Sequence, residues 1–227
     1  MPTVLITGAS RGIGLEFCRQ YAAKGWKVLA ACRNPAAAAE LNKLNGDVSL
    51  FALDVNDDSS IRQLADRLKG VPIDVLVNNA GISGREAGTL GSISSETFMD
   101  VLRTNTVAPL KVSESFADNV AASKERKLIA ITSRLGSIEL NDGGGMYGYR
   151  ASKAALNMVW KSLSLDLKAK NVICVVFHPG WVQTDMGGKG APVTPANSVA
   201  GMIKVISGLK PSDNGKFFNF DGAALAW

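Results

Sequence analysis

Histidine is almost absent from the sequence, since His178 is the single one among 227 residues. A histidine metal cluster or a histidine charge relay would have to be built around that residue alone. Cysteine is also scarce: Cys18, Cys32 and Cys174 are an odd number without C-x-x-C spacing, which argues against a disulfide framework and a metal site. We interpret His178, one residue before Pro179, as orienting its loop and not as a catalytic base.

Long hydrophobic runs and blocks of like charge are missing too. No apolar run approaches the ~18 residues that a membrane span needs. The first residues run directly into a glycine-rich turn without a basic segment or a cleavage site, which predicts no signal peptide and a cytoplasmic location. The net charge is only +5 and its Lys and Arg residues are scattered, so neither nucleic acid nor a membrane is an expected partner. A phosphorylated small ligand fits better.

Short apolar runs rich in β-branched residues recur along the chain and alternate with helical patterns. They cover residues 3–7, 26–32, 48–53, 73–77, 128–132, 172–177 and 216–220. Seven strands alternating with helices predict an α/β fold of the doubly wound Rossmann type, a parallel sheet with helices on both faces. Because nothing resembles a linker, we expect one domain over 1–227.

A glycine turn, Gly8-Ala9-Ser10-Arg11-Gly12-Ile13-Gly14, lies between the first strand and an amphipathic helix. Glycines there let the backbone approach a pyrophosphate at the helix N-terminus, although the spacing is G-x-x-x-G-x-G and not the general G-x-G-x-x-G. The same letters contain G-x-S-x-G, the nucleophile elbow of serine hydrolases. Only seven residues precede it, too few for the usual oxyanion loop, so the hydrolase is the weaker alternative.

Tyr149 and Lys153 are four residues apart, which places them on one face of a helix. A neighbouring ammonium favours a phenolate, so we expect Lys153 to lower the pKa of Tyr149 and make it a general acid/base. The pattern Y-x-x-x-K is short and gains meaning only from Ser133 upstream. In the predicted helix 98–122, Asn105 faces inward, and Pro109 leaves its carbonyl without a helical partner, which predicts a kink.

These motifs occur in a fixed order: TGASRGIG at 7–14, NNAG at 78–81, Asn105, Ser133, Tyr149 with Lys153, and Pro179-Gly180. In this order the chain resembles a short-chain dehydrogenase/reductase over nearly its whole length. The segments YGYRASKAALNM, HPGWVQTDMGG and FNFDGAALAW are similar to the C-factor and sniffer-like carbonyl reductases within that family.

The resemblance implies reduction of aldehyde or ketone carbonyls by hydride transfer from NADP(H). Tyr149 would donate the proton, Ser133 would stabilise the carbonyl oxygen, Lys153 would hold the nicotinamide ribose, and Asn105 would hold a water that links Lys153 to solvent. The implied cofactor-binding residues are Gly8, Ser10, Arg11, Gly12, Ile13, Gly14, Arg33, Asp54, Val55, Asn79, Ala80, Gly81, Tyr149, Lys153, Pro179, Gly180, Val182 and Thr184.

The residues themselves indicate NADP(H). An enzyme that selects NAD places an acid about 20 residues past the glycine turn. Here the second strand ends at Arg33, and no acid lies between Glu16 and Glu40. Arg33 and Arg11 are suited to bind a 2′-phosphate.

The sequence says less about the substrate and the oligomeric state. The insert 141–145 and a short lid at 186–195, rich in glycine and proline, predict an open site for broad or bulky carbonyl substrates. The resemblance implies a homodimer or homotetramer through helices 98–122 and 149–168, with a monomer possible. An NADP-binding regulatory or signalling protein on the same fold stays open as the alternative function.

Overall fold

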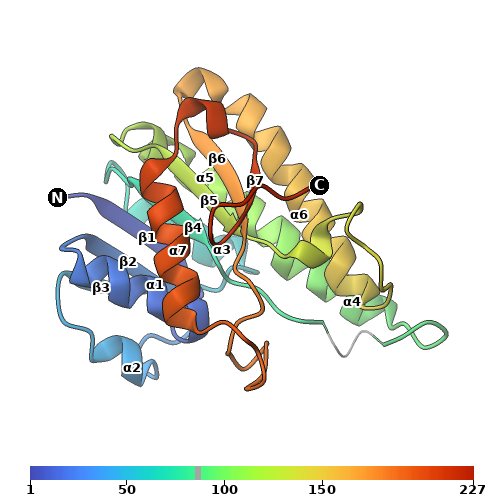
Figure 1. Ribbon diagram of the computed structural model, residues 1–227. Helices are drawn as coiled ribbons and strands as arrows, with labels where there is room; N and C mark the ends of the chain where they lie inside the picture. Colours follow the sequence, from blue (N-terminus) through green and yellow to red (C-terminus); the bar gives the residue numbers. More distant parts are fainter. Residues whose placement is uncertain (85–87) are drawn as a thin grey trace.

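The computed structural model describes residues 1–84 and 88–227. They form one parallel sheet with the strand order β3-β2-β1-β4-β5-β6-β7. The strands are β1 (Thr3–Thr7), β2 (Lys27–Cys32), β3 (Val48–Ala52), β4 (Val75–Asn78), β5 (Lys127–Ile131), β6 (Ile173–His178) and β7 (Phe217–Asn219). This architecture confirms the predicted doubly wound α/β fold (Figure 1).

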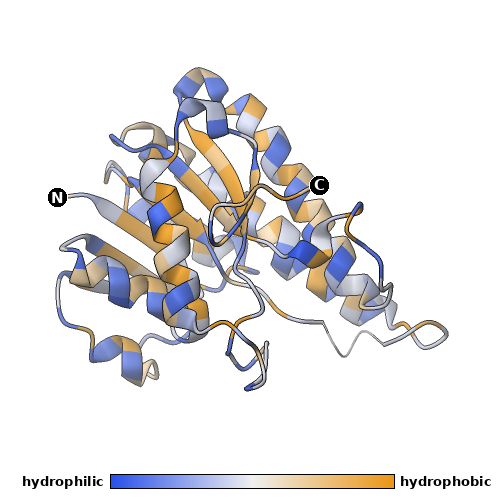
Figure 2. Ribbon diagram, in the orientation of Figure 1, coloured by the Kyte–Doolittle hydropathy of each residue, from blue (hydrophilic) through white to orange (hydrophobic). Residues whose placement is uncertain are grey.

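Helices cover both faces of the sheet. They are α1 (Gly12–Ala23), α2 (Ala39–Asn42), α3 (Asp58–Arg67), α4 (Ser95–Leu102), α5 (Ala108–Ala121), α6 (Tyr147–Asp166) and α7 (Pro195–Gly208). Strand residues alternate between two hydrophobic clusters, one shared with α1, α2 and α7 and the other with α3, α5 and α6. Because both faces are buried, the strands are nearly continuous apolar runs (Figure 2).

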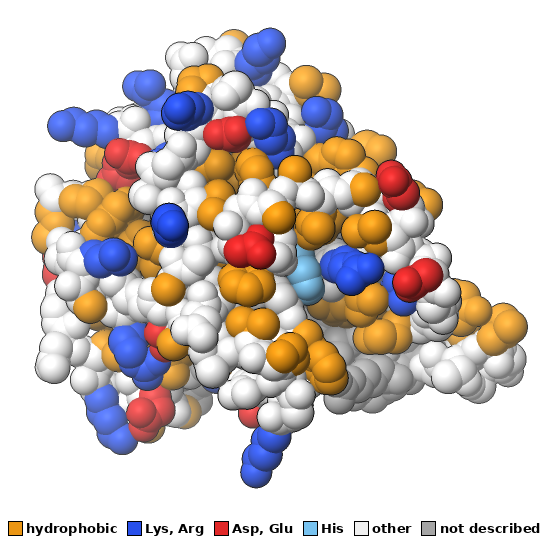
Figure 3. Space-filling model, viewed as in Figure 1, with side chains coloured by type: hydrophobic (Ala, Val, Ile, Leu, Met, Phe, Trp, Pro, Cys, Tyr) orange, Lys and Arg blue, Asp and Glu red, His pale blue; other side chains and the backbone are white. Residues whose placement is uncertain are grey.

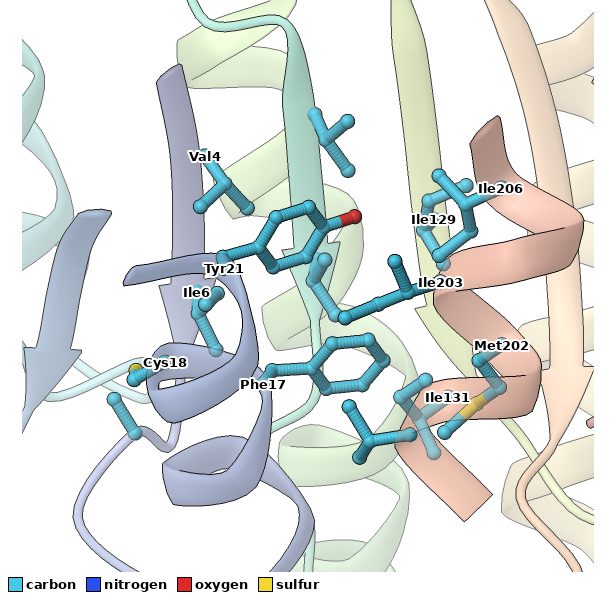
Figure 4. Packing of buried hydrophobic residues seen from close by; sticks show 14 of the residues in the cluster. Val4, Ile6, Phe17, Cys18, Tyr21, Ile129, Ile131, Met202, Ile203 and Ile206 are labelled. Carbon is cyan, nitrogen blue, oxygen red and sulfur yellow. The ribbon is translucent and has the colours of Figure 1, made fainter. Parts of the chain in front are cut away.

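The first cluster is built on aromatic residues of α1. Phe17 and Tyr21 project from α1 across the sheet toward α7, which contributes Met202, Ile203 and Ile206 to the same cluster (Figure 4). Phe17 is fully buried and Tyr21 is 1% exposed. Burial of each large side chain contributes about 1.5–3 kcal/mol, so this cluster fixes α1, and with it the glycine turn at its start, against the sheet.

The predicted helix 98–122 is interrupted by a π-helical turn, η2 (Arg103–Val107), between α4 and α5. In this turn the Ala108 N–H donates to the Arg103 carbonyl five residues earlier. Pro109 lies in the first turn of α5, where the missing N–H of proline is tolerated. The irregularity expected at Pro109 therefore takes the form of a π turn that carries Asn105, and such turns are frequent at functional sites.

All three cysteines are buried and free. Within residues 1–84 and 88–227, no cluster of His, Cys, Asp and Glu side chains could hold a metal ion. The same residues contain no helix long and apolar enough to cross a membrane.

Candidate active site

The predicted site residues follow the carboxyl ends of six neighbouring strands. In the order of the sheet these are Asp54 with Val55 after β3, Arg33 after β2, the glycine turn 8–14 after β1, Asn79 to Gly81 after β4, Ser133 after β5 and Pro179-Gly180 after β6. Parallel strands bring these segments to one edge, where ligands of doubly wound folds bind. The structure thus assembles the predicted residues in a single row.

The glycine turn has no room for a side chain at Gly8 or Gly14. Gly8 and Gly12 have positive φ values of 65° and 54°, which favour glycine. A Cβ on Gly14 would lie 2.3 Å from the Gly8 carbonyl oxygen, and one on Gly8 would lie 2.9 Å from Cα of Ala80. Asn79 donates from its side-chain amide to the carbonyls of Thr7, at 3.0 Å, and Gly8, at 3.2 Å. The turn is therefore locked against the segment that follows β4.

Helix α1 begins beside this turn without a side-chain cap. Arg11 is the N-cap residue in extended conformation, and among the described residues no side chain accepts a hydrogen bond from the first N–H groups. Uncapped N–H groups at a helix N-terminus suit an anionic phosphate. Together with the glycine cradle, they show that these residues fit the pyrophosphate of a dinucleotide.

The two candidate phosphate-binding arginines have different surroundings. Arg33 is exposed and has no ion pair within the described part of the chain. Arg11 donates to Asp185 at 3.2 Å, and both side chains are more than 70% exposed. This partner, 174 positions away in the sequence, was not predicted. Such a surface pair contributes at most about 1 kcal/mol, so it competes only weakly with a bound phosphate.

Ser133, Tyr149 and Lys153 converge where β5 ends against α6. Ser133 is buried, and its hydroxyl is hydrogen-bonded to Tyr149. The Lys153 ammonium donates to the Ile131 carbonyl at 2.9 Å and lies 5.8 Å from the centroid of the Tyr149 ring. A Cβ on Gly136 would lie 2.7 Å from the Lys153 backbone, so the turn after Ser133 packs directly on α6.

Burial dominates the electrostatics of this group and corrects one prediction. It raises the pKa of Tyr149, an effect that the hydrogen bond with Ser133 only partly offsets, so the expected lowering by Lys153 is wrong. The reason is that the Lys153 ammonium is directed at the Ile131 carbonyl and is itself buried, which lowers its pKa to about 8. Tyr149 is therefore a protonated donor at neutral pH.

Asn105 is fully buried, and every hydrogen-bonding group of its side-chain amide has a partner. Its oxygen accepts from the Ile82 N–H at 2.9 Å, and its nitrogen donates to the Ile82 carbonyl at 2.9 Å and to the Ser152 hydroxyl at 3.0 Å. Ser152 in turn donates to the Tyr149 carbonyl at 2.8 Å. Asn105 thus ties the π turn to α6. The role of Ser152 was missed because a serine between Tyr149 and Lys153 carries no sequence signal of its own.

The segment after β6 is held by several hydrogen bonds. Ser198 donates to the Pro179 carbonyl at 2.6 Å, and the Trp181 indole donates to the Gly187 carbonyl at 2.8 Å. Val182 is 4% exposed and forms a bridge with Val193. The segment 186–195, predicted to be a short lid, is therefore part of a loop that internal hydrogen bonds hold together. Thr184 lies against the glycine turn, since a Cβ on Gly12 would be 3.3 Å from its methyl group.

His178 does not hold its loop through Nδ1, because that atom is buried and has no hydrogen-bond partner among the described residues. Burial, and to a smaller extent the nearby Arg134, lowers the pKa of His178 to about 4. The imidazole is therefore neutral at physiological pH. No hydrogen bond joins it to Ser10 within residues 1–84 and 88–227, so the hydrolase alternative lacks its base.

The insert 141–145 is exposed and borders a cavity of about 260 Å³. The Arg150 side chain donates to the Gly144 carbonyl at 3.0 Å and closes one side of it. Leu135 and Tyr147 also line this cavity, close in sequence to Ser133 and Tyr149. The loop between the two hydroxyl residues therefore shapes the surface beside them.

Comparisons with known proteins agree with this geometry. A family model described as short chain dehydrogenase matches residues 2–192. The C-signal protein of Myxococcus xanthus is 42% identical over 156 residues, covering 69% of this chain and 93% of that protein.

Two solved structures superpose along the whole chain. Carbonyl reductase Sniffer of D. melanogaster has a TM-score of 0.92 at 35% identity and covers 100% of both chains. NADPH-bound carbonyl reductase from chicken fatty liver has a TM-score of 0.92 at 38% identity, covering 100% of this chain and 99% of that one. This chain therefore belongs to the short-chain dehydrogenase family and is an oxidoreductase of the C-factor and sniffer-like kind.

Proposed function

We propose that this oxidoreductase uses NADPH to reduce aldehyde or ketone carbonyls, with Tyr149 as the proton donor. The observation that carries the proposal is the hydrogen-bonded pair of Ser133 and Tyr149 beside Lys153, at the same sheet edge as the glycine cradle. The likeness to a carbonyl reductase described as NADPH-bound supports the choice of cofactor.

The cofactor would be held along the row of strand ends. The glycine turn and the start of α1 would hold the pyrophosphate, Arg33 and Arg11 the 2′-phosphate, and Asp54 with Val55 the adenine. Asn79 to Gly81 would line the adenine ribose, Lys153 would donate to the nicotinamide ribose, and the loop with Pro179, Gly180, Val182 and Thr184 would close over the nicotinamide. When bound, the nicotinamide supplies the hydride.

The hydroxyls of Ser133 and Tyr149 perform the acid chemistry. A substrate carbonyl oxygen between them accepts a hydrogen bond from each, and these bonds strengthen as negative charge develops on the oxygen. Tyr149 is suited to give its proton to that oxygen, because burial keeps the phenol protonated. The alkoxide that forms on the substrate as hydride arrives is far more basic than a phenolate, so it takes this proton even though burial raises the pKa of Tyr149.

Reprotonation of Tyr149 needs a path to solvent, which we assign to Lys153 and Asn105. A Cβ on Gly81 would be 3.8 Å from the Lys153 ammonium and 3.1 Å from the Asn105 amide oxygen, so the two side chains flank Gly81. Because Ile82 and Ser152 occupy the Asn105 amide, only its backbone carbonyl can hold the relaying water.

The substrates are inferred to be bulky or varied carbonyl compounds. The insert 141–145 is solvent-exposed beside the Ser133 turn, and the loop 181–193 is short. These two segments would border the substrate and leave room for a large one.

A second candidate is an NADP-binding regulatory protein with little catalysis. The likeness to a protein called C-signal supports it. Against it stands the hydrogen bond between Ser133 and Tyr149, because binding a cofactor alone requires neither hydroxyl.

NADPH oxidation, measured with a panel of aldehydes, ketones and quinones, separates the two candidates. If the protein reduces at least one of these substrate classes and Tyr149→Phe does not, the result supports the enzyme. Tight NADPH binding without turnover on any class would favour the regulator.

A further inference from the structure

A second cavity lies at the opposite edge of the sheet, between α1 and α7, with a volume of about 400 Å³. Its wall includes Val75 and Lys127, the first residues of β4 and β5. Ser133 is six residues further along the chain from Lys127, roughly 20 Å at the rise of a strand. The cavity is therefore separate from the active site.

The floor of this cavity is apolar and carries one unpaired hydroxyl. Tyr21 is 1% exposed and packs on Trp26 with ring centroids 4.8 Å apart. Figure 4 shows its phenol oxygen pointing from α1 toward Ile203 and Ile206. No side chain or backbone group of the described residues hydrogen-bonds this hydroxyl, and Tyr21 lines the cavity. A hydroxyl that lines a mostly apolar cavity without a protein partner can bond a polar ligand atom there.

The unpaired charge around the cavity is positive. Lys24, at the end of α1, and Lys204, in α7, are exposed, and neither ammonium has a partner in residues 1–84 and 88–227. Lys127 is instead paired with Glu125 at 2.6 Å, and this pair is neutral overall. On the face drawn in Figure 3, basic side chains lie beside hydrophobic surface.

We propose that this cavity binds a small aryl carboxylate that carries a second polar group. The ring would lie against Trp26, Ile203 and Ile206, with the carboxylate at Lys24 and Lys204 and the second polar group at the Tyr21 hydroxyl. Ligand sites of this kind are largely apolar with a few convergent polar groups, and 400 Å³ lies within their usual size. Burial also raises the pKa of Tyr21, so its hydroxyl remains a donor.

Isothermal titration calorimetry on the NADPH-saturated protein tests the proposal, because the cofactor then occupies the phosphate-binding arginines. The probes are para-hydroxyphenylpropanoate, phenylpropanoate, which lacks the hydroxyl, and the cation tyramine. We expect one equivalent of the first probe to bind, the second to bind more weakly, and tyramine not to bind.

The variants separate the two polar contacts. The double substitution Lys24→Gln/Lys204→Gln should weaken the binding of both carboxylate probes by about tenfold or more, which is the loss expected when a charge-assisted hydrogen bond is removed. Tyr21→Phe should weaken only the hydroxylated probe, to the level of phenylpropanoate. Lys168→Gln, the same charge change at an exposed position outside the cavity, is the control and should change neither. Unchanged NADPH-dependent turnover verifies that each variant is folded.

Ala200→Phe places a ring in the cavity wall and should abolish binding. Carboxylate binding that survives both this substitution and the lysine double substitution would place the ligand elsewhere and overturn the proposal. Preferential binding of tyramine, or no heat of binding with any probe, would overturn it as well.

Discussion

We predict that cofactor preference depends on Arg33 more than on Arg11. Arg33 is exposed at the end of β2 and has no ion pair in the described part of the chain, whereas Arg11 is paired with Asp185. A charge-assisted hydrogen bond contributes ~1.5–3 kcal/mol, which corresponds to roughly 10-fold to 100-fold in affinity. Arg33→Ala should therefore lower the ratio of kcat/KM for NADPH over NADH by about that factor.

Arg11→Ala should lower the same ratio less, because phosphate binding must first replace the contact with Asp185. Asp185→Asn provides the matched test, since it frees the Arg11 guanidinium and should raise the preference for NADPH by a few-fold. The assay is initial-rate kinetics with both cofactors at one fixed substrate concentration. Equal use of NADPH and NADH by the wild type, or a preference that survives Arg11→Ala with Arg33→Ala, would refute the reasoning.

Three further predictions concern the cradle, the histidine and assembly. Gly14→Ala should abolish NADPH binding measured by fluorescence, because its Cβ would lie 2.3 Å from the Gly8 carbonyl oxygen, whereas Gly208→Ala, with open space around it, should not. Between pH 4 and 6.5 the unfolded state binds a proton at His178 that the folded state does not. The free energy of unfolding should therefore rise with pH across this range, by up to about 3 kcal/mol. Urea titrations should show that His178→Asn flattens this rise. We also predict a homodimer through α4, α5 and α6, which Met158→Asp, at a 67% exposed site, should convert to monomers in light scattering; a wild-type mass of about 24 kDa would remove the dimer prediction.

The fold could be predicted from the sequence because its signals are local. Most strands of the sheet are buried apolar runs, such as Val4 to Ile6, and the glycine turn follows the first of them directly. The order of the motifs then predicted that the candidate site lies at the carboxyl ends of the strands. These inferences need only strand periodicity and the geometry of parallel sheets.

What the sequence could not provide depends on contacts between distant residues. The pairing of Arg11 with Asp185 spans 174 positions, and the bond from Asn105 to Ser152 spans 47. The direction of the Tyr149 pKa was predicted wrongly because helical spacing places Lys153 nearby without showing that its ammonium is directed at Ile131 or how deeply both groups are buried. Pro109 predicted an irregular helix, but the π turn that replaces a simple kink follows from packing against α6.

The turnover of Tyr149→Phe tests the central claim most directly. This substitution removes the phenol hydroxyl and its hydrogen bond with Ser133 but keeps the ring beside Lys153. If Tyr149 donates the proton, kcat for carbonyl reduction should fall by at least about 100-fold, the usual contribution of general acid catalysis, while the Kd for NADPH changes little. A variant that retains most of the wild-type kcat would contradict the proposed role of Tyr149.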